Sequence, residues 1–300
     1  MSVEFCGLRL AHPIVNGSGT FDVIAAVRAF GDGLREEFPF AAYVSKTITL
    51  LPRAGNPPPR LWEAPAGLIN SIGLPNKGLD AYMREDLPLL VDLRTAPDGP
   101  HVPLITNVMG ASAQELSRLV EACDERPEIA AVELNVSCPN VSTGLDIGAD
   151  PDQLEGVVQA VRRVTVKPLI VKLTPNTADV ALCARAAEEA GADAVSLINT
   201  LRAMALAPQA RGGRAAARWL GGGTGGLSGP AIRSIALAQV AAVAARVAIP
   251  VVGMGGVQTA AHARELLDVG ATLVAVGTES FRDPAAGARI AAGLQPAASA

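Results

Sequence analysis

The stretch Ile249-Pro-Val-Val-Gly-Met-Gly-Gly256 is followed, beyond a helix-like segment, by Val269-Gly-Ala-Thr-Leu-Val-Ala-Val-Gly-Thr278. Both runs open near a proline or glycine, continue as mostly apolar residues and end in glycine. Continuous apolar runs of this length are typical of strands that are buried on both faces, as in a parallel sheet covered by helices. The two runs therefore predict a β-α-β unit whose strands end in glycine-lined loops.

The same alternation of apolar strands with Ala/Leu/Glu/Arg-rich helical segments extends over most of the chain and predicts eight strands. They cover residues 13–16, 41–47, 102–108, 129–137, 168–174, 192–200, 250–255 and 271–277. Eight such units predict an α/β fold of the closed (β/α)8 type, the TIM barrel. We expect residues 1–300 to form a single domain with a short N-terminal extension and long loops at the C-terminal face of the barrel.

Composition excludes several classes of function. The 25 basic and 29 acidic residues give a net charge of -4 and no basic patch, so a nucleic-acid partner is disfavoured. The N-terminus lacks a signal-peptide pattern, and no apolar run is long enough to cross a membrane. We therefore expect a cytoplasmic protein that acts on a small molecule. No C-x2-C spacing, which would indicate a zinc or iron–sulfur site, occurs among the four cysteines, Cys6, Cys123, Cys138 and Cys183.

Polar residues gather at the predicted carboxyl ends of the strands, where TIM-barrel enzymes have their active sites. A single Ser, Thr or Asn there is most simply explained as a helix cap or a turn residue. Lys46 and Lys172 are harder to explain in this way, because lysine is almost never buried without a partner. They predict an anionic ligand. The set at the strand ends is Ser18, Gly19, Lys46, Thr47, Asn107, Asn135, Cys138, Lys172, Asn199, Thr200, Gly255, Gly256, Gly277 and Thr278.

Glycines after the last two strands indicate a phosphate site. Glycine lets backbone N–H groups approach a phosphate closely, and the loops after strands 7 and 8 commonly bind phosphate in this fold. The alternative is that these glycines only form turns. The run 221–226 has the spacing GxGxxG but follows no predicted strand, so a Rossmann site is rejected. We expect a flexible loop there, with Ser228 capping the next helix and Gly229 near the same phosphate.

The segment Glu133-Leu-Asn-Val-Ser-Cys-Pro-Asn140 ends an apolar strand with amides, a hydroxyl and a thiol. A thiol in this setting can act as a nucleophile or as a general base. His12, His101 and His262 lie away from the strand ends and offer no rival base. Cys138 is therefore the candidate, unless it is only a small apolar residue. Amide groups that suit a flat ring with alternating C=O and N–H groups come from Asn70, Asn107, Asn135, Asn140 and Asn199.

Taken together, these motifs resemble the FMN-dependent dihydroorotate dehydrogenases, which oxidise dihydroorotate to orotate in pyrimidine biosynthesis. The resemblance covers almost the whole chain. The pairing of Asn70-Ser-Ile-Gly-Leu-Pro-Asn76 with Ser137-Cys-Pro-Asn140 is its most specific part, whereas glycine pairs are shared by many FMN barrels. Further matching motifs are Ser18-Gly-Thr20, Ser45-Lys-Thr47, Ile198-Asn-Thr200, Gly225-Gly-Leu-Ser-Gly-Pro230 and Gly277-Thr278.

The resemblance implies roles for particular residues in one FMN-binding domain and no metal site. Cys138 would take the C5 proton while the C6 hydride passes to flavin N5, and Lys172 would stabilise the N1/O2 edge of the ring. Substrate contacts would come from Lys46, Asn70, Ser71, Ile72, Gly73, Leu74, Asn135, Asn199 and Thr200. Cofactor contacts would come from Ser18, Lys46, Thr47, Asn107, Asn135, Lys172, Ile198, Gly229, Gly255, Gly256, Gly277 and Thr278.

Cysteine at position 138 resembles the soluble class 1 enzymes, since the membrane-associated class 2 has serine there. The stretches around Asn199 and Gly225 look like the NAD-linked subclass 1B, which implies a homodimer, or a heterotetramer with a subunit carrying FAD and a 2Fe-2S cluster. The chain departs from the family at Ala203-Met-Ala-Leu-Ala207, where Gly-Met-Ala-Ile-Asp is usual. Alternatives are a dihydropyrimidine dehydrogenase-type reductase, a phosphate-binding barrel without flavin, and a non-catalytic flavin carrier.

Overall fold

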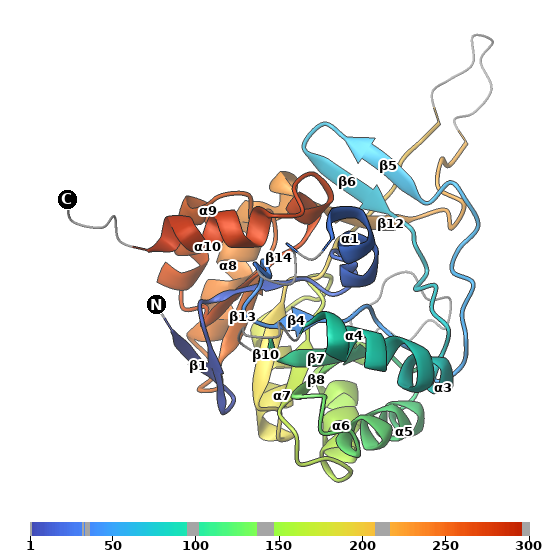
Figure 1. The fold of residues 1–300 in the computed structure, drawn as a ribbon, viewed down its shortest axis with the longest axis vertical. Coiled ribbons are helices and arrows are strands. Elements are labelled where there is room, and N and C mark those ends of the chain that lie inside the picture. The colour runs from blue at the N-terminus through green and yellow to red at the C-terminus, as the bar shows by residue number, and fades with distance from the viewer. Residues whose placement is uncertain are drawn as a thin grey trace.

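The computed structural model describes residues 2–31, 33, 37–94, 102–136, 147–207 and 217–295. Its centre is a parallel sheet of eight strands in the order β3-β14-β13-β10-β9-β8-β7-β4 (Figure 1). The strands are β3 Ile14–Asn16, β4 Tyr43–Val44, β7 Leu104–Val108, β8 Ala131–Asn135, β9 Leu169–Lys172, β10 Ala194–Leu197, β13 Val251–Met254 and β14 Leu273–Val276. All eight predicted strands are therefore confirmed, each with narrower bounds than predicted, and almost every strand residue is buried.

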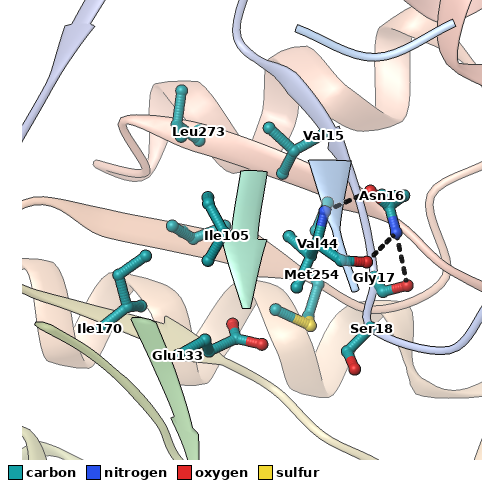
Figure 2. Close-up of a pocket in the computed structure, with 12 residues that line it drawn as sticks. Val15, Asn16, Gly17, Ser18, Val44, Ile105, Glu133, Ile170, Met254 and Leu273 are labelled. Atoms are coloured by element: carbon teal, nitrogen blue, oxygen red, sulfur yellow. Dashed lines mark hydrogen bonds between the residues drawn. The ribbon is translucent and has the colours of Figure 1, made fainter. Parts of the chain in front are cut away.

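The first and last strands of this sheet are joined by a side chain. Asn16 at the end of β3 accepts a hydrogen bond from the Val44 N–H at 2.8 Å and donates to the Val44 carbonyl, also at 2.8 Å (Figure 2). The amide of Asn16 thus takes the place of a backbone peptide group between β3 and β4. A buried polar side chain of this kind is stable because its donor and acceptor are both satisfied. It closes the barrel at the seam.

Helices cover the outside of the barrel, packing apolar faces against the strands. They are α1 Val23–Phe30, α3 Leu79–Ala81, α4 Leu87–Leu93, α5 Ala113–Asp124, α6 Pro151–Arg162, α7 Val180–Glu189, α8 Arg233–Ala244, α9 Ala260–Asp268 and α10 Ala286–Leu294. Five of these described helices begin at a side chain that accepts a first-turn N–H hydrogen bond, as N-cap residues do: Asp22, Ser112, Asp150, Asp179 and Thr259. In the described part of the chain, no helix is both long and apolar enough to span a bilayer.

The N-terminal extension is a hairpin of β1 Val3–Phe5 and β2 Leu8–Leu10. Phe5 and Leu10 are each 1% exposed and join the cluster of side chains that fills the barrel interior, so the hairpin covers the amino end of the barrel. The thiol of Cys6 in its turn bonds to the carbonyl of Asp193, just before β10.

A second sheet lies over the opposite, carboxyl end (Figure 1). Its antiparallel strands β5 Leu61–Ala64, β6 Gly67–Asn70, β11 Leu201–Ala203 and β12 Gly225–Ser228 are ordered β11-β12-β6-β5. The expectation of a flexible loop before residue 230 was therefore wrong. Ser228 is not a helix cap either, because it lies within β12 and Gly229 precedes the short helix that follows. The main-chain ladder to β6 explains why glycines suit this strand: a Cβ on Gly225 would lie 2.4 Å from the Asn70 carbonyl oxygen.

Candidate active site

A cavity of about 470 Å³ opens at the carboxyl ends of the barrel strands, beneath the antiparallel sheet. This volume suits a cofactor-sized ligand. The residues predicted from the sequence that line it are Ser18, Lys46, Thr47, Asn70, Ile72, Leu74, Asn135, Lys172, Ile198, Asn199, Thr200, Gly229, Gly255, Gly256, Gly277 and Thr278. Residues that lie up to about 260 positions apart in the chain thus share one cavity because parallel strands all end on the same face.

Three predicted residues do not line the cavity. Ser71 is fully buried and accepts a hydrogen bond from Asn56 Nδ2 at 3.0 Å. Gly73 has a φ of 74°, and a Cβ there would lie 2.5 Å from the backbone nitrogen of Asn56. Both residues therefore shape the loop that carries Ile72 and Leu74 into the cavity, and direct substrate contact by them is not supported. Asn107, the third, is fully buried on β7.

Several wall residues were missed by sequence reasoning. Leu61 and Leu68 come from the antiparallel sheet, which the sequence did not predict. Ser228 accepts a hydrogen bond from the Thr278 hydroxyl at 2.9 Å and so links the antiparallel sheet to the end of β14. The others are Gly17, Ile232, Met254 and Phe281, whereas Gly19 and Thr20 line the cavity as part of the motif Ser18-Gly-Thr20 that the sequence identified. Phe281 follows the recognised Gly277-Thr278 motif closely, and that nearness was the only signal that could have found it.

One end of the cavity is built from tightly packed glycines. Gly229, Gly255 and Gly256 have φ values of 90°, 134° and 69°, which side-chain-bearing residues rarely adopt. A Cβ on Gly256 would lie 2.8 Å from the Cβ of Arg233 and 2.9 Å from the Gly229 carbonyl oxygen. Thr278 begins a helical turn, whose first N–H groups have no acceptor within the turn. This end can therefore present backbone N–H groups to a phosphate.

We expect Gly256→Ala to lower the affinity for the flavin that the sequence resemblance implies at least about tenfold, because a left-handed alanine costs about 1–3 kcal/mol and its methyl group would displace the loop. The affinity is measured by titrating flavin into the apoprotein. Gly31→Ala is the matched control: Gly31 has a φ of 72°, and a Cβ added there would meet no described atom within 4 Å. It tests backbone strain without a clash, and an equal loss of affinity in both variants would contradict the role of Gly256 in the phosphate loop.

The two lysines face the cavity from different strands. Lys172, at the end of β9, is only 5% exposed, and in the described part of the chain no acceptor lies within hydrogen-bonding distance of its ammonium group. Lys46, just after β4, is exposed toward the mouth, and partial desolvation by the cavity wall lowers its pKa. A buried, unpaired ammonium is costly unless a ligand supplies negative charge. The cavity therefore fits an anionic or electron-rich group beside Lys172.

The floor contains a hydrogen-bonded acid. Glu133, on β8, accepts from Asn107 Nδ2 at 2.5 Å and from the Ser196 hydroxyl at 2.7 Å. Asn107 Oδ1 is buried and has no partner among the described residues. Asn135, two residues beyond Glu133, does line the cavity and donates to Thr47 Oγ1 at 3.4 Å. The sequence signal for Glu133 was a carboxylate inside an otherwise apolar strand, before the strand end where polar residues gather.

Cys138, the predicted catalytic residue, lies outside the described residues, as does Asn140. The other cysteines behave as small apolar residues. Burial raises the pKa of Cys6 and of Cys123 to about 12 and also raises that of Cys183. These thiols therefore stay protonated at neutral pH and are poor bases or nucleophiles. In the part of the chain that the structure describes, no cluster of His, Cys, Asp or Glu could hold a metal ion.

Fold and site together define a (β/α)8 barrel of the enzyme type, with a cavity that can accept a phosphate-bearing ligand beside a buried lysine. Residues 1–297 match the family model described as dihydroorotate dehydrogenase, and the chain belongs to that family. Its activity is the oxidation of dihydroorotate in pyrimidine biosynthesis, and the family is one of flavin-dependent oxidoreductases. The resemblance, the barrel fold and the reaction predicted from the sequence are thereby confirmed. The interpretations as a barrel enzyme without flavin and as a non-catalytic carrier are set aside.

The chain is similar to the proteins named "Dihydroorotate dehydrogenase B (NAD(+)), catalytic subunit" of Geotalea uraniireducens and Geobacter sulfurreducens. The first is 45% identical over 296 residues, which cover 98% of this chain and 92% of the relative. The second is 43% identical over 303 residues, with the same coverage. Among solved structures, dihydroorotate dehydrogenase from Eimeria tenella in complex with ferulenol superimposes with a TM-score of 0.79 at 21% identity, covering 98% of this chain and 83% of that one. That likeness supports the fold alone.

Proposed function

We propose that the flavin is FMN, held in the 470 Å³ cavity with its phosphate at Gly229, Gly255, Gly256, Gly277 and Thr278. The observation that carries this proposal is Lys172: a buried ammonium without a protein acceptor among the described residues faces the same cavity as the glycine loops. The ring would lie with its N1/O2 edge at this lysine, while Ser18 and Thr47, which are hydrogen-bonded to each other at 3.3 Å, border the same cavity.

Substrate would occupy the outer part of the cavity, toward the antiparallel sheet. Lys46 supplies a cation for the carboxylate of dihydroorotate, and Asn70, Asn199 and Thr200 supply amide and hydroxyl groups for its ring. Asn70 Nδ2 also donates to the Gly226 carbonyl at 3.3 Å, so β12 fixes the orientation of this amide. The carboxylate of dihydroorotate thus accounts for Lys46, whereas the uncharged ring of a dihydropyrimidine would leave this cation without a counter-charge.

Oxidation of dihydroorotate requires a proton to leave its C5 atom and a hydride to leave its C6 atom. FMN, when bound, would supply the hydride acceptor at N5. We assign proton removal to Cys138, whose thiolate would hold the proton on Sγ. Lys172 favours negative charge on the neighbouring ring edge, and Leu61, Leu68 and Phe281 border the cavity with apolar surface that limits access of water.

The purified protein tests this assignment directly. Cofactor released by denaturation is identified by mass spectrometry, which distinguishes FMN from FAD and from the absence of flavin. The holoprotein is then mixed anaerobically with dihydroorotate or with dihydrouracil. We expect FMN, rapid loss of the flavin absorbance with dihydroorotate, and little loss with dihydrouracil. Equal rates with the two compounds would favour the dihydropyrimidine dehydrogenase type.

The affinity for orotate should depend on pH through Lys46. Partial desolvation lowers the pKa of Lys46 below its usual 10.5, so its positive charge is lost at a lower pH than that of a solvent-exposed lysine. We therefore expect orotate binding, followed by the flavin absorbance, to be constant near pH 7 and to weaken at alkaline pH. Lys46→Gln should weaken binding about 10- to 100-fold at pH 7, because a charge-assisted bond is worth about 1.5–3 kcal/mol. Lys46→Gln should also lose this part of the pH dependence, and an unchanged profile would contradict the role of Lys46.

We also propose that the chain is the catalytic subunit of an NAD-linked enzyme. The support comes from the relatives named as the B-type, NAD(+) catalytic subunit, and from the resemblance to subclass 1B. The partner would be a separate subunit that carries FAD and a 2Fe-2S cluster and binds a homodimer of this chain. Without that subunit, the reduced flavin would pass its electrons to another acceptor. Turnover with NAD, fumarate and quinone, measured for the chain alone and with a candidate partner, tests this. NAD reduction by the isolated chain would contradict the two-subunit arrangement. A cytoplasmic location remains our expectation.

A further inference from the structure

The barrel interior holds an acidic side chain that the reaction described above does not use. Glu133 is 4% exposed and precedes the cavity-lining Asn135 by two positions on β8, so it lies closer to the amino end of the barrel. It borders a small interior cavity of about 10 Å³, which shares Met254 with the flavin cavity. Figure 2 shows the Glu133 carboxylate pointing into the space between Ile105 and Met254.

Polar groups from the neighbouring strands converge on this carboxylate. Asn107 on β7 donates to one oxygen at 2.5 Å, and Ser196 on β10 donates to the other at 2.7 Å. Burying a carboxylate is costly, and these two bonds offset part of that cost. They also orient Asn107, because one N–H of its amide is committed to Glu133 and leaves the second N–H and Oδ1 to bond elsewhere. That oxygen is buried and has no partner among the described residues.

Glu133 and Lys172 lie close in the barrel without forming an ion pair. In the β8–β9 register Lys172 is level with Asn135, and in the β9–β10 register it is level with Ser196, the donor to Glu133. Among the described residues, the ammonium group has no carboxylate within salt-bridge distance. The negative charge of Glu133 therefore acts on the flavin cavity at a distance, from the side nearer the amino end of the barrel. The intervening protein screens this charge less than water does.

We propose that Glu133 is a positioning residue of the flavin site: it holds the Asn107 amide in one orientation and, by opposing Lys172, lowers the midpoint potential of the bound flavin. This inference rests on the proposed FMN site. The Glu133 carboxylate would disfavour the extra electron density of a reduced flavin in the neighbouring cavity, whereas Lys172 would favour it. The two groups together set how readily electrons enter the flavin and leave it again.

Glu133→Gln tests the charge, since glutamine has the same shape and can still bond to Ser196 and Asn107. The flavin midpoint potential of the holoprotein is measured by spectroelectrochemistry. We expect reduction to become more favourable by roughly tenfold, a rise of about 30 mV for a two-electron couple. Glu121→Gln, at an exposed site on α5, is the control for loss of one carboxylate and should leave the potential unchanged. A potential in Glu133→Gln equal to that of the wild type overturns the proposal.

Glu133→Asp separates charge from positioning. It keeps the carboxylate but withdraws it by one methylene group, so the potential should stay near that of the wild type while flavin affinity, titrated on the apoprotein, falls several-fold because Asn107 is no longer held. A shift as large as that of Glu133→Gln would show that the shape of the network sets the potential and would overturn the electrostatic role. Wild-type affinity in Glu133→Asp would overturn the positioning role. If the wild-type chain took up no flavin, the proposed FMN site would fail instead, and the two failures are thus distinguishable.

Discussion

Replacing Cys138 by alanine is expected to slow the anaerobic reduction of the bound flavin by dihydroorotate about 10²- to 10⁴-fold, the usual contribution of a general base. The physical reason is that the C5 proton then has no acceptor in the site, whereas the hydride acceptor and the binding groups are intact. Stopped-flow absorbance of the flavin measures the rate, and orotate titration measures binding. We expect the affinity for orotate to change little, because the substrate contacts are assigned to Lys46 and the asparagines.

Two further variants make the result specific to the base. Cys138→Ser keeps a proton acceptor of much higher pKa, so its rate should fall between those of the wild type and the alanine variant and should rise further into the alkaline range. Cys6→Ser is the matched control: Cys6 lies in the hairpin at the far end of the barrel, and burial raises its pKa to about 12. Flavin reduction in Cys138→Ala at the wild-type rate would show that another group removes the proton.

Replacing Lys172 by methionine is expected to have opposite effects on stability and on activity. The apoprotein should become more stable, because a buried ammonium without a partner among the described residues is replaced by an apolar side chain of similar length. Flavin reduction should slow about 10²- to 10³-fold, which is the usual cost of removing one group that stabilises developing charge. Thermal unfolding of the apoprotein and stopped-flow reduction of the holoprotein measure the two effects.

Lys77→Met provides the control for this pair of effects. Lys77 is exposed and forms surface salt bridges with Glu85 at 3.1 Å and Asp86 at 2.7 Å. Such pairs contribute little to stability, so neither the unfolding temperature nor the reduction rate should change appreciably. If Lys172→Met destabilised the apoprotein, Lys172 would have a structural role, and its assignment to the flavin edge would lose its main support.

Polar side chains were predictable where they interrupt an apolar pattern. Lys46 and Lys172 stand at the ends of otherwise apolar strands, and the barrel rule that all strands end on one face placed them together. Gly255, Gly256 and Gly277 were also predictable, because a glycine directly after a strand indicates a loop whose backbone groups can contact a ligand. All three line the cavity as expected.

The sequence did not predict which residues support the cavity without lining it. Ser71, Gly73 and Asn107 belong to motifs that the sequence identified, yet their side chains or backbones support the site instead of lining it. Which residue faces a cavity depends on loop conformation and on a few degrees of strand rotation, and neither leaves a periodic signal. Glu133 was overlooked for a related reason: its partners Asn107 and Ser196 lie 26 and 63 positions away along the chain.

The antiparallel sheet over the site shows the same limit at a larger scale. Its four strands are three or four residues long, and half of β12 is glycine. Strands so short have no clear alternation of apolar and polar residues, and glycine disfavours strands in general. Strand β12 forms because β6 pairs with one of its edges and β11 with the other. These partners lie apart in the sequence, so no local pattern indicates the pairing.

The sequence by itself determined the barrel, the face that carries the chemistry, and the family, because buried strands leave continuous apolar runs and short functional motifs keep their residue types. Only the tertiary structure decided which of those residues share the cavity, that Lys172 meets no partner there among the described residues, and that Glu133 lies bonded beneath the floor. These facts depend on distances between residues remote in the chain, and such distances are set by closure of the sheet and packing of the loops, which no local pattern records.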